Sequence, residues 1–290
     1  MGTPAYRSIG RSAANIWKIM MVTDVMGLAA QAAYFFFFSL FPLLLFTAPL
    51  LSVLGNRQHM TDVLFQQLAD VVPSDAYSLV QKILREVVFV KGAPGVISLG
   101  AVLTLWSGSN VFSALTDALN HAFGTRESRP WWKTTLMACA FVIGASIVGL
   151  VATAIFLDGE AIVHAVVSVA GMGSHAQTLW TVLQYPIALA FVVLFAWAVY
   201  YFLPNRRLTA HEALMAALAA TLLWIIVTLA FRLYVQHFNS YNKIYGTIGA
   251  VVILLTWMYL SMLAILIVGA VAADRHGRRI QAGELTQAGA

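Results

Sequence analysis

The sequence predicts an all-α protein that crosses a membrane six times. The chain is 60% hydrophobic and only 10% charged, and its mean hydropathy is +0.81. It also contains six long stretches without Asp, Glu, Lys or Arg, each about the 20 residues that a helix needs to cross the hydrocarbon core, or longer. So few charged groups cannot cover the surface of a soluble protein of 290 residues, so lipid must solvate much of the chain.

Each predicted span is an apolar run between flanking charged or polar residues. The runs are apolar on all sides, as in Phe35–Phe38 and Val251–Leu255, and do not alternate with a period of two, which favours helices over a β-barrel. No linker rich in Gly, Ser or Pro separates them, so we expect one membrane domain over residues 1–290. The predicted spans are residues 28–54, 93–119, 134–157, 178–203, 211–232 and 245–272.

Two further segments are predicted to lie on the membrane surfaces. In residues 1–27 an apolar face opposes a basic one, as in an interfacial helix: Ile9, Ala13, Ile16 and Met20 against Arg7, Arg11 and Lys18. In the outer loop, residues 55–92, an apolar stripe stops at Pro73 and restarts after Ser74, which predicts two amphipathic helices within residues 62–90. These helices form either a lid on the bundle or a binding surface.

The distribution of Lys and Arg predicts the orientation. With the N-terminus in the cytoplasm, eleven of these residues fall inside and six outside, and four of the outer ones lie in the long loop, where they count for less. Both termini, including the tail at 273–290, are therefore predicted to be cytoplasmic. The net charge of +5 and the pI of about 9.4 then belong to loops that face anionic headgroups, so nucleic-acid binding is not expected.

Signals for catalysis, metal binding or a cofactor are weak. The histidines are too far apart in sequence for a paired-His metal motif, and His211-Glu212 lacks the second His of a zinc-protease helix. The sequence contains no GxxxxGK[ST] phosphate loop, and Cys139 is its single cysteine. We therefore expect no enzyme, no catalytic residues, no metal and no cofactor.

Polar and charged groups gather instead at the two ends of the predicted bundle. Ionisable groups are costly in lipid, which makes them candidates for function, whereas the midplane carries mainly Ser and Thr hydroxyls. This pattern suits a lipid headgroup that moves along the bundle better than a hydrated ion held midway. Alternatively, the polar groups only anchor helix ends. The predicted site for an anionic amphiphile has an inner mouth of Asp117, Asn120, Arg126 and Arg129 and an outer end of Arg232, Asn242, Lys243 and Tyr245.

Several segments resemble the YihY/BrkB-like family of membrane proteins over nearly the whole chain. They are residues 33–43, 118–130, 202–207 and, most specifically, Tyr241-Asn242-Lys243-Ile244-Tyr245-Gly246 with residues 249–251 and 255–261. Members usually end the last span with a Gly-Ala-Glu-Leu-like sequence, whereas Gly269-Ala270-Val271-Ala272 lacks the glutamate. If that glutamate has a role in relatives, this protein either does without it or uses Asp274.

The resemblance implies a bacterial inner-membrane protein, and it leaves three functions open. Some members carry a ribonuclease BN label, and others a link to virulence or envelope integrity. We expect a transporter or flippase-like handler of an anionic envelope lipid, with a structural or scaffolding protein of envelope integrity as the alternative. A ribonuclease is disfavoured because a metal-dependent nuclease needs clustered His and Asp ligands. The expected partners are membrane lipids, and a homo-oligomer or an envelope partner stays open.

Overall fold

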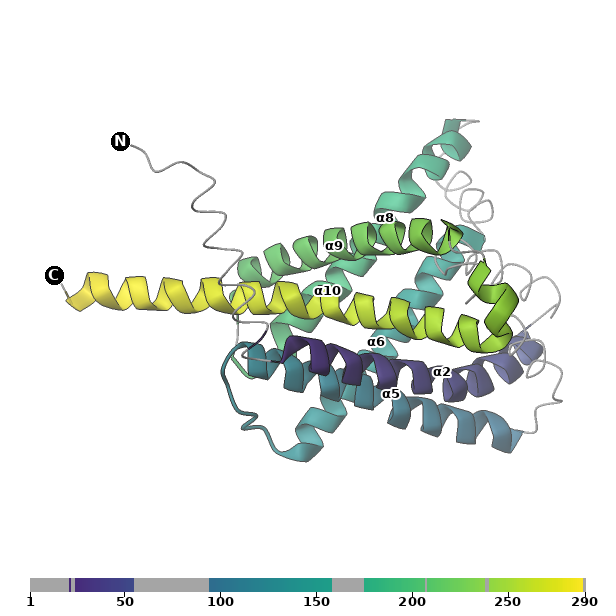
Figure 1. Cartoon of the computed structure of the whole chain (residues 1–290), viewed down its shortest axis with the longest axis horizontal. Helices are drawn as coiled ribbons and strands as arrows, with labels where there is room; N and C mark the ends of the chain where they lie inside the picture. Colours follow the sequence, from purple (N-terminus) through teal and green to yellow (C-terminus); the bar gives the residue numbers. More distant parts are fainter. Residues whose placement is uncertain are drawn as a thin grey trace.

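The computed structural model describes residues 21, 24–54, 94–157, 175–206, 208–237 and 240–288, and this part of the chain is helical without strands. The all-α fold class is therefore confirmed. Most of residues 1–27 and both helices predicted within residues 62–90 lie outside the described residues. The helices are α2 (Val25–Leu54), α5 (Pro94–Ala122), α6 (Trp131–Leu157), α8 (His175–Phe202), α9 (Ala210–His237) and α10 (Ser240–Ala288) (Figure 1).

Five of these helices contain a segment long and apolar enough to cross a membrane. The described segments are Val25–Leu43, Trp131–Gly149, Leu183–Phe202, Ala210–Gln236 and Ile248–Gly277. No such segment is found among the described residues of α5, whose middle carries Ser107, Ser109 and Asn110. Five candidate spans are thus found, and the sixth stays a prediction.

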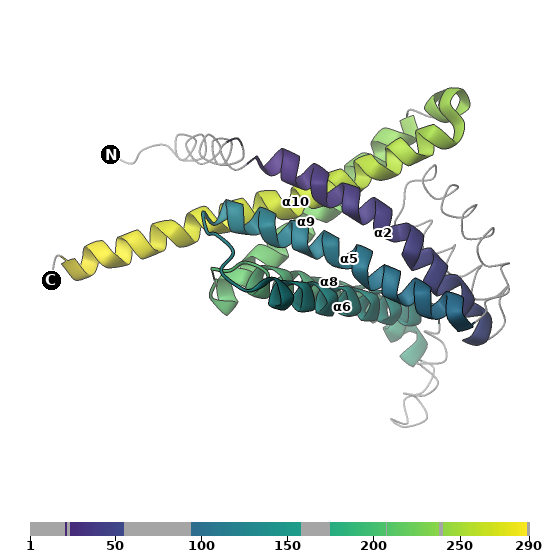
Figure 2. The same ribbon diagram turned by 90° about the horizontal axis from the view of Figure 1, so that it is seen from below.

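The helices pack in a closed ring that follows chain order. Each of α2, α5, α6, α8 and α9 packs against the next helix along the chain, and α10 closes the ring by packing against α2. α10 also contacts α5. Its C-terminal part continues as a long helix beyond the ends of the other helices (Figures 1 and 2). The connections 123–130 and 203–209 lie where α5 and α8 end and where α6 and α9 begin, and we call this the connection end of the bundle.

Three helices pack closely around Gly269 of α10. A Cβ atom at this position would lie 2.6 Å from Leu119 Cδ2 on α5 and 3.6 Å from Tyr200 Cε1 on α8, so a larger residue would displace the Leu119 side chain. The Tyr200 side chain is fully buried, and its hydroxyl donates a hydrogen bond to the Ile265 carbonyl at 2.7 Å. The connection end is therefore a packed core.

Buried alanines and an indole hydrogen bond mark the packing of α9. Ala213, Ala216, Ala217 and Ala220 are buried in its first half, as close helix packing in lipid favours. Farther along, Trp224 Nε1 donates to Ser261 Oγ at 3.1 Å, and Ser261 Oγ donates to the Trp257 carbonyl at 2.8 Å. Large apolar side chains such as Trp106, Leu136 and Ile248 are exposed on the bundle, as lipid-facing residues would be.

Candidate functional site

The loop between α5 and α6 is shaped by a glycine and a proline. Gly124 follows the last turn of α5 with a φ of +60°, a conformation that glycine adopts without steric cost. The Thr125 N–H then donates to the Asn120 carbonyl at 2.9 Å, which closes the helix end. Pro130 precedes α6, and its carbonyl accepts the Lys133 N–H at 2.9 Å. These two ends fix residues 125–129 in a short, ordered crossing.

Arg129 uses its whole guanidinium group within the protein. Its Nε donates to Glu127 Oε1 at 2.8 Å, and its Nη2 donates to Glu127 Oε2 at 2.7 Å, which forms a bidentate ion pair. Nη2 also donates to the Leu203 carbonyl at 2.7 Å and Nη1 to the Phe202 carbonyl at 3.1 Å. Since Nη1 further contacts Met137 Sδ at 3.3 Å, each N–H of the guanidinium has an acceptor. Arg129 thus joins the α5–α6 loop to the end of α8.

Two asparagines complete this network. Asn120 is 3% exposed, donates from Nδ2 to Glu127 Oε2 at 2.8 Å, and accepts the Asn205 N–H at 2.7 Å. The Asn205 Nδ2 donates to the Arg126 carbonyl and to Ser128 Oγ, both at 2.9 Å. We call this cluster the α5–α6 joint, made of Asn120, Glu127, Ser128, Arg129 and Asn205.

The joint lowers the pKa of its carboxyl group. The hydrogen bonds from the Arg129 side chain are the main cause, and together with those from the Arg129 backbone and Asn120 they bring the pKa of Glu127 from 4.5 to about 2, although burial acts in the opposite direction. Glu127 therefore carries its negative charge at any physiological pH, and Arg129 neutralises it.

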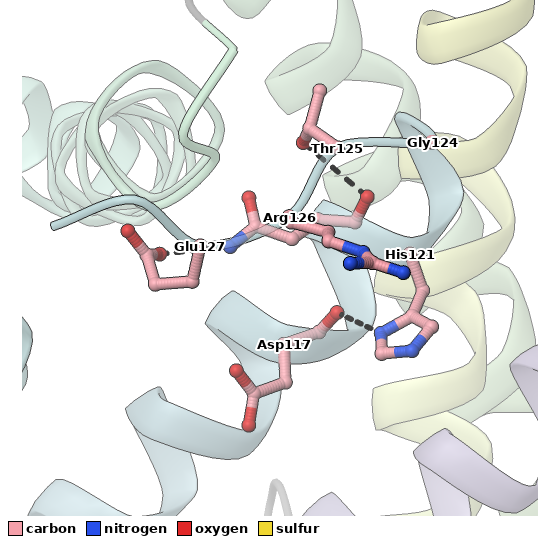
Figure 3. Close-up of a pocket in the computed structure, with 7 residues that line it drawn as sticks. Asp117, His121, Gly124, Thr125, Arg126 and Glu127 are labelled. Carbon is pink, nitrogen blue, oxygen red and sulfur yellow. Dashed lines mark hydrogen bonds between the residues drawn. The ribbon is translucent and has the colours of Figure 1, made fainter.

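A pocket of about 340 Å³ opens beside the joint. In Figure 3 the Arg126 side chain extends toward His121, whereas the Asp117 carboxylate points away from both. His121 Nδ1 donates to the Asp117 carbonyl at 2.8 Å, so Nε2 is the nitrogen left for a ligand. The guanidinium of Arg126 is exposed and makes no hydrogen bond or ion pair with the residues that the structure describes. The pocket is lined by Asp117, Asn120, His121, Gly124, Thr125, Arg126 and Glu127.

The structure brings the four residues of the predicted inner mouth to one corner of the bundle, but in two environments. Asp117, Asn120 and Arg126 line the pocket, while Arg129 lies in the joint behind it. Sequence reasoning left out Glu127 and Asn205. The signal for Glu127 was its place between Arg126 and Arg129, and Asn205 lay within a segment already singled out by the resemblance.

The predicted outer end is described only in part. Arg232 lies exposed near the end of α9, about 30 Å along that helix from Glu212 at 1.5 Å per residue. Asn242, Lys243 and Tyr245 lie in the first turns of α10, and their side chains fall outside the described part. Their role as ligands stays a prediction.

Metal binding finds no support among the described side chains. In this part of the chain, no group of three or more His, Cys, Asp or Glu side chains is placed to hold a metal ion. Cys139 of α6 is a free cysteine.

Comparison of the sequence with known proteins shows which family the chain belongs to. The family model described as virulence factor BrkB matches residues 16–289. The ribonuclease-like protein YfkH of Bacillus subtilis is 31% identical over 252 residues, which is 87% of this chain and 90% of that protein.

UPF0761 membrane proteins are also similar. The one from Alteromonas mediterranea is 28% identical and covers 82% of this chain and 78% of its own length, and the one from Tolumonas auensis is 29% identical over 62% of this chain and 57% of its own length. No solved structure matches significantly. On the match to the family model over nearly its whole length, the chain belongs to the virulence factor BrkB family of membrane proteins.

Proposed function

We propose that this protein handles an anionic envelope lipid as a transporter or flippase-like protein, and that the pocket beside the α5–α6 loop binds the headgroup. The observation that carries the proposal is that two arginines on one loop have different hydrogen-bond partners. Arg129 is saturated by the joint, whereas Arg126 lines the pocket and has no partner among the described residues. A cation held at the rim of an apolar bundle attracts phosphate groups of lipids.

The charges of the pocket favour an anion on one side. Arg129 offsets the charge of Glu127, so the remaining charged side chains of the pocket are Arg126 and Asp117. Because Arg126 lies on one side and the Asp117 carboxylate points away, a phosphate would bind against the guanidinium of Arg126 (Figure 3). The carboxylate would then exclude anions from the other side.

The proposal includes six spans, with α5 as the sixth. α5 packs between α2 and α6 in the ring of helices, which places it beside helices that can span a membrane. Its hydroxyl groups bond to its own backbone: Thr104 to Gly100, Ser109 to Trp106 and Thr116 to Phe112, each at 2.7 Å. Polar groups satisfied inside the helix are tolerated in a bilayer, so these hydroxyl groups are compatible with a sixth span.

We place the connection end in the cytoplasm of a bacterial cell, with both termini on that side of the inner membrane. Arg126, Lys133 and Arg206 lie at this end, and so do the exposed indoles of Trp131 and Trp132. Basic residues favour the cytoplasmic side, and tryptophans favour the interface. A cysteine placed at position 206 should resist a membrane-impermeant thiol reagent in intact cells and react after the membrane is opened. Labelling from outside would reverse the orientation.

At the opposite end, Arg232, Asn242, Lys243 and Tyr245 would receive the headgroup after it passes along the bundle. This route needs no catalytic residue, metal or cofactor. Reconstitution into liposomes tests it: a fluorescent anionic phospholipid should become accessible to an external quencher faster with the protein than in empty vesicles. Arg126→Gln should slow this step severalfold, and Arg206→Gln, a matched exposed arginine outside the pocket, should not. Equal rates with and without protein would refute transport.

One observation favours the alternative, a scaffolding protein of envelope integrity. The α5–α6 joint and the close contact at Gly269 make the connection end a firmly packed unit, as a docking platform requires. A stable complex with an envelope protein, together with absent lipid movement, would support it. The ribonuclease reading rests on the name of YfkH, and we expect purified protein to show no metal-dependent cleavage of RNA.

A further inference from the structure

The Asp117 carboxylate differs from two other carboxylates at the connection end. Glu127 accepts two hydrogen bonds from the Arg129 guanidinium, and Glu212 lies 2.9 Å from His276 Nδ1. The Asp117 side chain is exposed, and its carboxylate accepts no hydrogen bond from the residues that the structure describes. A carboxylate can accept several hydrogen bonds at once, so Asp117 offers its full capacity to a donor from outside the protein.

The pocket keeps two opposite charges apart. Arg126 and Asp117 both line it, yet they form no ion pair with each other. In Figure 3 the guanidinium extends toward His121, whereas the carboxylate points the other way. A ligand that satisfies both groups therefore needs an acceptor for Arg126 and, several atoms farther along, a donor for Asp117.

The size of the pocket suits a headgroup that is longer than a bare phosphate. Its volume of about 340 Å³ lies at the lower end of the range of about 300 to 1,000 Å³ that is usual for ligand pockets. The loop adds free space at Gly124, where a Cβ atom would meet nothing within 4 Å. A phosphate at Arg126 thus leaves room for a short polar chain that leads toward Asp117.

We propose that the pocket selects a phosphodiester headgroup that carries hydroxyl groups, such as phosphoglycerol, with the phosphate at Arg126 and a hydroxyl donating to the Asp117 carboxylate. This inference rests on the proposed function, because it takes the pocket as the site of an anionic lipid. An ammonium group would also donate to a carboxylate, but its charge would cancel that of the phosphate. A hydroxyl leaves the headgroup anionic, so it is the donor that fits such a lipid.

Asp117 is then the residue that determines specificity. Arg126 attracts any anionic phosphate and does not by itself distinguish one headgroup from another. A site that hydrogen-bonds a ligand hydroxyl discriminates against the analogue that lacks it, because the polar group of the site then loses its partner. Asp117 is exposed, so water replaces a missing hydroxyl and the expected preference is only about fivefold.

Native mass spectrometry of the protein released from nanodiscs at neutral pH tests this selection. The nanodiscs contain equal parts of phosphatidylglycerol, phosphatidylpropanol, phosphatidylethanolamine and phosphatidylcholine. Phosphatidylpropanol is the matched lipid, since it has the same charge and the same three headgroup carbons as phosphatidylglycerol but neither hydroxyl. The parent protein should retain about fivefold more phosphatidylglycerol than phosphatidylpropanol. In Asp117→Ala this ratio should fall to about one, whereas Arg126→Gln should lower the retention of both lipids.

Asp24→Asn is the control variant. It removes an exposed negative charge at the start of α2, outside the pocket, and keeps a side-chain oxygen for the Gly27 N–H, so the ratio should stay at the parent value. A ratio that persists in folded Asp117→Ala, or retention of phosphatidylethanolamine above phosphatidylglycerol, would overturn the selection.

The same measurement separates the selection from the proposed function. Equal retention of both anionic lipids by the parent protein, each above phosphatidylcholine, would overturn the selection by Asp117 and leave an anionic-lipid site in place. Retention of neither lipid above phosphatidylcholine would contradict the proposed function, and the selection with it.

Discussion

The α5–α6 joint and the α9–α10 clasp, which consists of Thr209, Glu212 and His276, each bind a glutamate side chain with a different basic residue. In each, a glutamate at the connection end accepts hydrogen bonds from its own segment and from a basic side chain. Glu127 is paired with an arginine that also reaches two carbonyls of the α8 end, whereas Glu212 is paired with a histidine through one N–H. Arginine also keeps its charge at all accessible pH values. The first contact therefore rests on several donors of one charged group, and the second on a single N–H.

Removing the arginine of the joint should have the largest effect. Arg129→Gln leaves the carboxylate of Glu127 without its ion pair and two carbonyls of the α8 end without a donor, so the free energy of unfolding should fall by about 3 kcal/mol or more. Unfolding in bicelles by steric trapping would measure it. Arg126→Gln is the matched control and should change stability by less than about 0.5 kcal/mol. Similar losses in both variants would show that Arg129 and Arg126 contribute equally to stability, against what their contacts indicate.

Acid should weaken the joint in a defined range. The pKa of Glu127 is about 2 in the folded protein and 4.5 without its partners, so its contribution is complete above about pH 4.5 and is lost as pH falls toward 2. Its carboxylate is partly exposed, so solvent screening limits the loss to about 2 kcal/mol. Unfolding measured across this range should follow that profile in the parent protein. In Glu127→Gln the step should disappear, and an unchanged step would assign it to another carboxyl group.

A loss of similar size should follow from removal of the buried amide of the joint. Asn120→Ala removes the acceptor of the Asn205 N–H and one donor to Glu127, which should cost about 2 kcal/mol of unfolding free energy. Asn205→Ala should cost no more, because its amide bonds to more exposed groups. Thermal unfolding of the two variants in one detergent gives the comparison, and a larger loss in Asn205→Ala would contradict the account.

The smallest effect is expected at the cap of the clasp. Thr209→Ala removes the hydroxyl that accepts the Glu212 N–H, which should lower stability by about 1 kcal/mol. Thr209→Ser keeps the hydroxyl and should restore most of the loss. If both variants unfold alike, the capping box does not hold Glu212, and the fixed position of its carboxylate would need another cause.

Much of the fold could be predicted from the sequence, because uncharged runs mark helices in lipid whatever their neighbours are. The helix α2 begins at Val25, three residues before the predicted span, since Asp24 caps its first turn. α10 continues as a helix to Ala288, through residues that hydropathy alone assigned to a tail. α5 was predicted as a span from its uncharged length, and it is not among the five candidate segments found within the described residues.

The candidate site was only partly predictable. The predicted cluster of Asn120, Arg126 and Arg129 follows from their common place at one helix end. The sequence could not show that Arg129 is saturated and Arg126 is not, because Arg129 reaches carbonyls 73 and 74 residues away. The pairing of Glu212 with His276 likewise depends on how α9 and α10 pack, because the two residues lie 64 positions apart in the sequence.

The central claim is that Arg126, and not Arg129, is available to an anionic headgroup. Native mass spectrometry of the protein released from nanodiscs, with phosphatidylglycerol against phosphatidylcholine, tests this most directly. Arg126→Gln should retain severalfold less phosphatidylglycerol than the parent protein, the difference should shrink as salt rises, and retention of phosphatidylcholine should not change. Equal retention of phosphatidylglycerol by the folded Arg126→Gln variant and the parent protein would contradict the claim.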